Sequence, residues 1–147
     1  DEEMRERIEA HRRARCGGGW ETIEEYGDIV PIVQRATKDF NVVLVDCLTL
    51  WLNNLMRAAD ERGEAFGEQD ISCRSRKLLE ACAGAAGDIF FIANEVGMGI
   101  VPDNALARRF RDCAGRCNQE LAALADEVVV VSCGIPLRLK GGDCGPV

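Results

Sequence analysis

Asn41-Val42-Val43-Leu44-Val45-Asp46 is the stretch that decides the fold of this chain. It is a continuous apolar run that ends in a carboxylate, which predicts a strand that is apolar on both faces. Such a strand belongs in the middle of a parallel sheet that helices cover on both sides. A second run of the same kind predicts a buried strand over 88–93.

Amphipathic stretches separate these strands, and the alternation of helix and strand predicts an α/β fold. We expect one domain over 1–147, a mostly parallel sheet flanked by helices, and a Gly-rich tail from Gly141 that frays. The expected helices cover 2–15, 27–38, 48–60, 70–86 and 103–125, and the further strands cover 127–132 and 134–140.

Composition narrows the function classes. Hydrophobic residues make up 47% and charged residues 29% of the 147 residues, as in ordinary globular proteins. The net charge of −7 argues against broad nucleic-acid binding, which needs a large basic face. No apolar run approaches the roughly 20 residues of a membrane span, so we expect a soluble, cytoplasmic protein.

Eight cysteines are many for this length, and none of them forms a Cys-x-x-Cys pair. Cys113 and Cys117 are one helical turn apart, so they could place two thiolates on a metal. Two small buried hydrophobic side chains would have the same spacing, and we favour that interpretation.

The single histidine, His11, lies in an arginine-rich stretch. In a helix over 2–15 it shares one face with Met4 and Ile8, and three arginines follow within a turn. Neutral imidazole is a nucleophile toward phosphorus, and guanidinium groups neutralise phosphate oxygens. The stretch suggests chemistry on a phosphate, although a histidine at the edge of the core beside a solvated basic face would show the same pattern.

Two features are expected at one edge of the sheet. Asp46 ends its strand as the acid of a Walker B motif does, where nucleoside triphosphatases hold Mg²⁺; a cap for the following helix is the alternative. The run Asn-Glu-Val-Gly-Met-Gly-Ile-Val-Pro (94–102) leaves the second strand at the same edge. Its glycines, Gly97 and Gly99, allow a tight turn or a close approach to a ligand.

These motifs resemble the bifunctional adenosylcobinamide kinase / adenosylcobinamide-phosphate guanylyltransferase family of cobalamin biosynthesis. The resemblance covers almost the whole chain and is strongest in 94–102 and in the run NALARRFRDCAGRCN (104–118). It implies a P-loop NTPase-like (RecA-like) fold, usually a homotrimer. It also implies that ATP or GTP phosphorylates adenosylcobinamide, and that GMP then passes from GTP through a histidine, giving adenosylcobinamide-GDP and pyrophosphate.

The resemblance assigns roles to particular residues. His11 matches the histidine that carries GMP, and Asp46 matches the acid expected to bind Mg²⁺. Glu24 matches a nucleotide-binding position and could bind the guanine or ribose edge. From their place at the ligand-binding edge of the sheet, four more residues are candidates to contact the substrate or to support the residues that do: Asn94, Glu95, Gly97 and Gly99. The other positions that match nucleotide-binding residues are Arg12, Arg13, Ala14 and Arg15.

The family opens with a strand and a Gly-x-x-x-x-Gly-Lys-Ser phosphate loop, and this sequence contains no such run. The sequence begins at Asp1 without an initiator methionine. We therefore expect that a segment of roughly thirty residues, the size of a βαβ unit, is missing before it, with the first strand and the phosphate loop. Two alternatives stay open: a non-catalytic binding or assembly subunit of the same fold, and a P-loop-related nucleotidyltransferase or kinase with another substrate.

Overall fold

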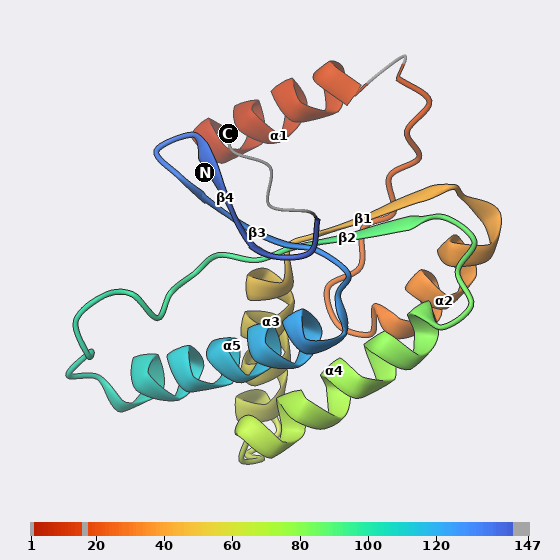
Figure 1. The fold of residues 1–147 in the computed structure, drawn as a ribbon. Helices are drawn as coiled ribbons and strands as arrows, with labels where there is room; N and C mark the ends of the chain where they lie inside the picture. Colours follow the sequence, from red (N-terminus) through yellow and green to blue (C-terminus); the bar gives the residue numbers. More distant parts are fainter. Residues whose placement is uncertain (1, 16–17, 143–147) are drawn as a thin grey trace.

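The computed structural model of the chain describes residues 2–15 and 18–142 (Figure 1). Helices and strands alternate along most of it, as the sequence predicts, and the expected ends agree to within a few residues. The elements are α1 (Glu2–Arg15), α2 (Val30–Asp39), β1 (Val42–Asp46), α3 (Leu48–Glu61), α4 (Glu68–Cys82), β2 (Asp88–Ile92), α5 (Ala105–Leu124), β3 (Val128–Ser132) and β4 (Ile135–Lys140).

β1 and β2 form a parallel pair. Val42 lies opposite Asp88 at one end of the ladder, and Asp46 lies opposite Ile92 at the other. The chain between the two strands contains α3 and α4, which is the long crossover that a parallel connection requires. The predicted α/β fold with a parallel sheet is confirmed for these two strands.

β3 and β4 depart from the prediction of a mostly parallel sheet. They pair with each other as an antiparallel hairpin, and in the part of the chain that the structure describes they form a separate two-stranded sheet. The turn explains this: Cys133 and Gly134 have φ values of 53° and 78°. Two consecutive residues with positive φ make the tight turn that matches the twist of a hairpin, so the chain returns directly along β3.

The core lies where α2–α5 pack against one another below the parallel pair (Figure 1). Helix α3 contributes an apolar stripe that repeats every three or four residues, as an amphipathic helix does. Trp51 in this stripe also donates a hydrogen bond from Nε1 to the carbonyl of Gly27, at 2.8 Å, which ties the segment before α2 to the core. The side chains at most 1% exposed include Leu52, Ile71, Leu78 and Cys113.

The parallel pair is buried on one face rather than on both, contrary to the prediction. Val45 and Phe91 pack against the helical core, whereas the side chains that alternate with them stay exposed. The physical reason is that α2–α5 all lie on one side of the pair (Figure 1). The exposed apolar side chains of the other face are Val42, Leu44, Phe90 and Ile92, with exposed fractions from 42% to 51%.

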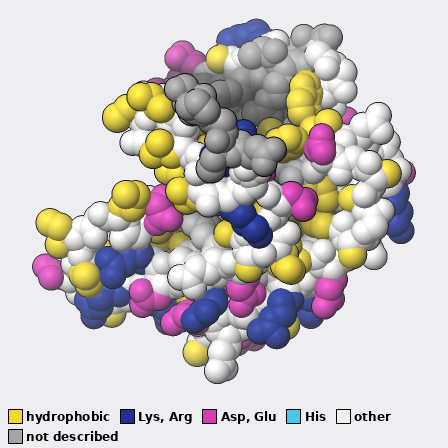
Figure 2. Space-filling view, viewed as in Figure 1, with side chains coloured by type: hydrophobic (Ala, Val, Ile, Leu, Met, Phe, Trp, Pro, Cys, Tyr) yellow, Lys and Arg dark blue, Asp and Glu magenta, His cyan; other side chains and the backbone are white. Residues whose placement is uncertain are grey.

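The surface reflects this division. In the view of Figure 2, charged side chains cover the helical lower half, and hydrophobic side chains gather in the upper half around the strands. Within residues 2–15 and 18–142, no helix combines the length and the apolar character that crossing a membrane requires.

Candidate active site

The carboxyl ends of β1 and β2 bring together the two features that the sequence predicts there. Asp46 ends β1 and its ladder partner Ile92 ends β2, so the chain leaves both strands at one edge. Asn94, two residues beyond β2, donates its backbone N–H to Oγ1 of Thr49 in the first turn of α3, at 2.8 Å. Ligands of open α/β folds bind outside this edge, so the arrangement is a candidate site.

The structure excludes the alternative that Asp46 is the N-cap of the following helix. The N-cap of α3 is Cys47, whose Sγ accepts the backbone N–H of Leu50 at 3.4 Å. Asp46 lies one residue earlier, with its side chain exposed to solvent. A carboxylate at this place is accessible to a ligand and is not used to begin the helix.

The loop from Asn94 to Asn104, which we call the edge loop, is held at both ends. At its start, Thr49 binds the amide of Asn94. At its end, Oδ1 of Asn104 accepts the N–H of Ala107, so the helix begins at Ala105 rather than at 103. Arg108 donates from Nη1 to the carbonyls of Pro102 and Asp103, at 2.9 and 2.6 Å.

The two glycines of the edge loop have different surroundings. Oε1 of Glu95 accepts the N–H of Gly97 at 2.6 Å, and a Cβ on Gly97 would lie 2.8 Å from that oxygen. A Cβ on Gly99 would meet nothing within 4 Å. Gly97 therefore lies close to the carboxylate of Glu95 in its own loop, and the expected approach of these glycines to a ligand stays a prediction. The tip beyond it is exposed and apolar, with Ile100 97% exposed.

Helix α1 lies apart from this edge, on the other side of the strands from α3 and α5 (Figure 1). Arg13 is exposed and pairs with Glu9 of the same helix at 3.6 Å. Glu24 lies in the segment between α1 and α2 and accepts the hydroxyl of Tyr26 at 3.3 Å. The backbone of the other predicted site residues forms part of α1, but the structure does not describe their side chains. These residues are His11, Arg12, Ala14 and Arg15.

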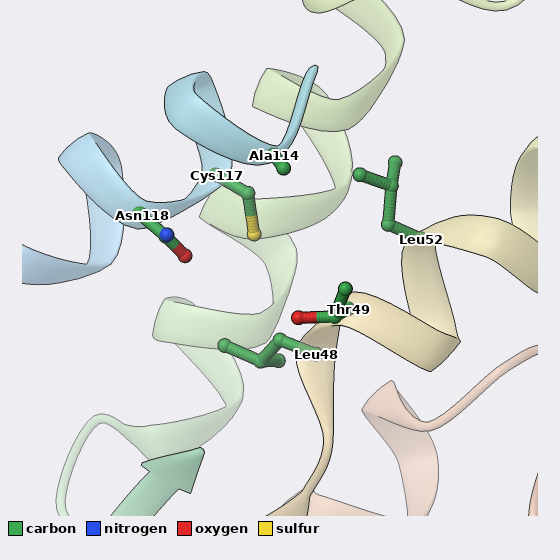
Figure 3. Close-up of a pocket in the computed structure, with 6 residues that line it drawn as sticks. All are labelled: Leu48, Thr49, Leu52, Ala114, Cys117 and Asn118. Carbon is green, nitrogen blue, oxygen red and sulfur yellow. The ribbon is translucent and has the colours of Figure 1, made fainter. Parts of the chain in front are cut away.

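A small hollow opens behind Thr49, between α3 and α5 (Figure 3). The Thr49 hydroxyl and the Asn118 amide point toward it from the two helices. Its volume of about 10 Å³ is the room that one water molecule needs. The sequence motifs include Arg108 and Asn118 without predicting a role for them here, and they do not include Thr49. A hydroxyl three residues after a strand-ending carboxylate is the signal that could have indicated Thr49.

Cys113 and Cys117 are buried in the core, as expected of small hydrophobic side chains. Burial raises the pKa of both thiols above its usual range. Ser75 donates to the sulfur of Cys117 at 3.4 Å. Among the described residues, no group of three or more His, Cys, Asp and Glu side chains is arranged to hold a metal ion. Cys16 and Cys144 lie outside the described residues.

An α/β fold with an exposed carboxylate and a glycine-containing loop at the carboxyl edge of parallel strands is typical of ligand-binding α/β enzymes. Comparison with known families shows to which family within this class the chain belongs. The chain belongs to the family described as cobinamide kinase / cobinamide phosphate guanyltransferase, which matches residues 1–139. The resemblance inferred from the sequence is confirmed.

Curated relatives agree with this assignment. The chain is 39% identical over 146 residues to the bifunctional adenosylcobalamin biosynthesis protein CobU of Escherichia coli K12, covering 95% of this chain and 80% of the relative. It is 37% identical to CobU of Salmonella typhimurium, with the same coverage. It is 37% identical over 141 residues to CobP of Pseudomonas aeruginosa, covering 96% of this chain and 77% of the relative. The prediction of an enzyme of this family is confirmed.

Proposed function

We propose that this protein phosphorylates adenosylcobinamide with ATP or GTP and then transfers GMP from GTP to adenosylcobinamide phosphate. The products of the second step are adenosylcobinamide-GDP and pyrophosphate. The observation that carries the proposal is the family match over residues 1–139. Because both nucleotides are abundant in the cytoplasm, we expect the protein to act there.

His11 is the residue we propose to carry the GMP. The lone pair of its neutral imidazole attacks the α-phosphorus of GTP, and the bond from that phosphorus to the bridging oxygen breaks, so that pyrophosphate leaves with the electron pair. A phosphate oxygen of adenosylcobinamide phosphate then attacks the same phosphorus. The P–N bond breaks, and its electron pair returns to the imidazole.

The residues around His11 suit this chemistry. Arg12, Arg13 and Arg15 follow it within about one helical turn, and guanidinium groups stabilise the charge that develops on phosphoryl oxygens. Glu24 accepts a hydroxyl hydrogen bond from Tyr26, and we propose that this exposed carboxylate binds the guanine or ribose edge of the nucleotide.

Asp46 fits an Mg²⁺ ion delivered with the nucleotide. Mg²⁺ usually keeps several water ligands and binds one or two carboxylates together with substrate phosphates. Asp46 offers one exposed carboxylate that the cap of α3 does not use. When bound, Mg²⁺ would neutralise phosphate charge. In this proposal Asp46 would hold the ion at the strand edge, where the edge loop begins with Asn94 and Glu95.

We also infer a homo-oligomer, a trimer by its resemblance to the family. The exposed apolar face of β1 and β2 supports a contact between subunits, because contiguous apolar surface of this kind commonly marks an interaction site. Light scattering after size-exclusion chromatography tests the inference. A monomer at micromolar concentration would contradict it.

The guanylyl intermediate can be tested by labelling the full-length protein with α-³²P-GTP and Mg²⁺, followed by alkaline denaturing electrophoresis. We expect an acid-labile, alkali-stable label that His11→Ala abolishes. Glu6→Ala is the matched control, because Glu6 is exposed on the same helix, and it should keep the label. γ-³²P-GTP should leave no alkali-stable label. Labelling of the His11→Ala variant, or an unlabelled wild type, would refute the role of His11.

A further inference from the structure

Thr49 connects two parts of the site that are far apart in sequence. Its Oγ1 accepts the backbone N–H of Asn94 at 2.8 Å, across 45 residues of chain. Thr49 lies three residues after Asp46, at the beginning of α3. This hydrogen bond therefore holds the start of the edge loop close to the segment of chain that carries Asp46.

The strand ladder cannot supply this connection. It ends with the pair Asp46 and Ile92, after which one chain turns into α3 and the other continues into the edge loop. The two backbones separate at this point, and the threonine side chain bridges them. Threonine suits the task because its branched β-carbon restricts the side chain to few rotamers.

The other polar contacts described for the edge loop act elsewhere. Glu95 binds the amide of Gly97 within the loop. Arg108 and Asn104 relate the end of the loop to α5. Val96 adds an apolar contact with the core. The Thr49 hydrogen bond is thus the polar contact that ties the loop to the junction of β1 and α3.

We propose that Thr49 is a positioning residue, which sets the edge loop relative to Asp46 and so aligns the groups of the loop with the bound substrates. The reaction it serves is the one under Proposed function, and the inference rests on that function. A displacement of about 1 Å in a group that orients a substrate is enough to slow a reaction substantially. Thr49 acts through the backbone of Asn94 and need not touch the substrate.

Two substitutions of Thr49 and one control separate its hydroxyl from its shape. Thr49→Val keeps the branched side chain and removes the hydroxyl. Thr49→Ser keeps the hydroxyl. Thr37→Val is the matched control, because the hydroxyl of Thr37 is in the core and donates to the carbonyl of Gln34 in its own helix.

The first measurement is the hydrogen-exchange rate of the Asn94 amide by NMR in the full-length protein. Since one hydrogen bond contributes on the order of 1 kcal/mol, Thr49→Val should accelerate this exchange about fivefold. Thr49→Ser and Thr37→Val should leave it within about twofold. An unchanged exchange rate in Thr49→Val would overturn the proposal.

The second measurement is kcat/KM for GMP transfer to adenosylcobinamide phosphate by the same variants. Thr49→Val should lower it at least about fivefold, and Thr49→Ser should restore it. Faster exchange at Asn94 with an unchanged kcat/KM would overturn the positioning role. A wild type without any transfer would refute the proposed function instead, and the exchange rates would still decide whether Thr49 holds the loop.

Discussion

At the scale of single residues, two neighbours at the junction of β1 and α3 have different roles: Cys47 caps the helix, and Asp46 is an exposed carboxylate. Cys47 begins the helix by accepting the amide of Leu50. Asp46 is thereby left exposed at the strand end, where parallel α/β sheets bind ligands. The apolar run before Asp46 predicts the position of this carboxylate, but only the cap geometry shows that the helix does not need it.

Replacing Asp46 with Asn should therefore impair function and spare the fold. In the proposed function this carboxylate would hold Mg²⁺, so the loss of its charge should lower kcat/KM for GMP transfer on the order of 10²-fold. Stability should change by less than about 0.5 kcal/mol, because the side chain is exposed. Asp88→Asn is the matched control, since Asp88 is exposed at the opposite end of the same ladder and should behave as wild type. Equal activity of the two variants would exclude Asp46 from the site.

The buried cysteines predict a selective thiol reactivity. Burial raises the pKa of Cys113 and Cys117, and the reactive species is the thiolate. In the folded protein at pH 8, a disulfide reagent should modify the exposed Cys73 and Cys133 first and leave the two buried thiols until denaturation. Mass spectrometry of the modified peptides checks the order. Early modification of Cys117 would show that the core opens readily.

The same pKa shift has a consequence for stability. The folded-state pKa of these thiols is above the unfolded-state value, so the unfolded chain loses its thiol protons first as the pH rises. The stabilisation they contribute is complete below the usual thiol pKa of 9.0 and declines as the pH rises toward the higher folded-state value. We expect the free energy of unfolding to fall above pH 9 by this route.

At the scale of elements, the start of β2 depends on a close approach of two backbones. Asp88 donates its N–H to the carbonyl of Asn41 at 2.9 Å, just before the ladder begins. A Cβ on the preceding Gly87 would lie 2.0 Å from that same carbonyl oxygen. The absence of a side chain at this position is thus a condition for pairing β1 with β2.

Gly87→Ala should destabilise the protein by about 2–3 kcal/mol, because backbone atoms cannot move aside as the end of a side chain can. Gly115→Ala is the opposite case, since a Cβ there meets nothing within 4 Å and the residue lies inside α5. It should stabilise the protein by about 0.5–1 kcal/mol. Urea unfolding of both variants measures the two changes. A neutral Gly87→Ala would contradict the close approach.

The positions of the strands could be predicted from the sequence, whereas the pairing of β3 with β4 could not. Apolar runs and helical periods are local signals, so the strands at 42–46 and 88–92 are predicted to within a residue. The pairing of β3 with β4 depends on the backbone of Cys133, a non-glycine residue at φ 53°. The sequence has no strong hairpin signal here, such as Asn-Gly, that would predict a positive φ at Cys133.

At the scale of the whole molecule, the parallel pair has helices on one face and exposed apolar side chains on the other. Leu44 is 47% exposed and Phe90 is 51% exposed, and the two lie opposite each other in the ladder. The hairpin also exposes apolar side chains, among them Val131 and Leu139. Surfaces of this kind bind partners, or associate when no partner covers them.

The 147 residues by themselves should therefore bind the hydrophobic dye ANS, and should associate as their concentration rises. Leu44→Thr together with Phe90→Thr should reduce both effects, because threonine suits a strand and offers less apolar surface. Leu124→Thr is the control, as Leu124 is 70% exposed at the end of α5. An equal loss of dye binding in the control would show that the sheet face is not the responsible surface.

The sequence by itself determined the alternation of helices and strands, the places of His11 and Asp46 along the chain, and the family, because these are encoded in local periods and contiguous motifs. Only the tertiary structure decided that Thr49 holds Asn94, that Gly87 must lack a side chain, and that one face of the parallel pair stays open. Each of these depends on contacts between segments that are distant in sequence, and such contacts arise only when the elements pack.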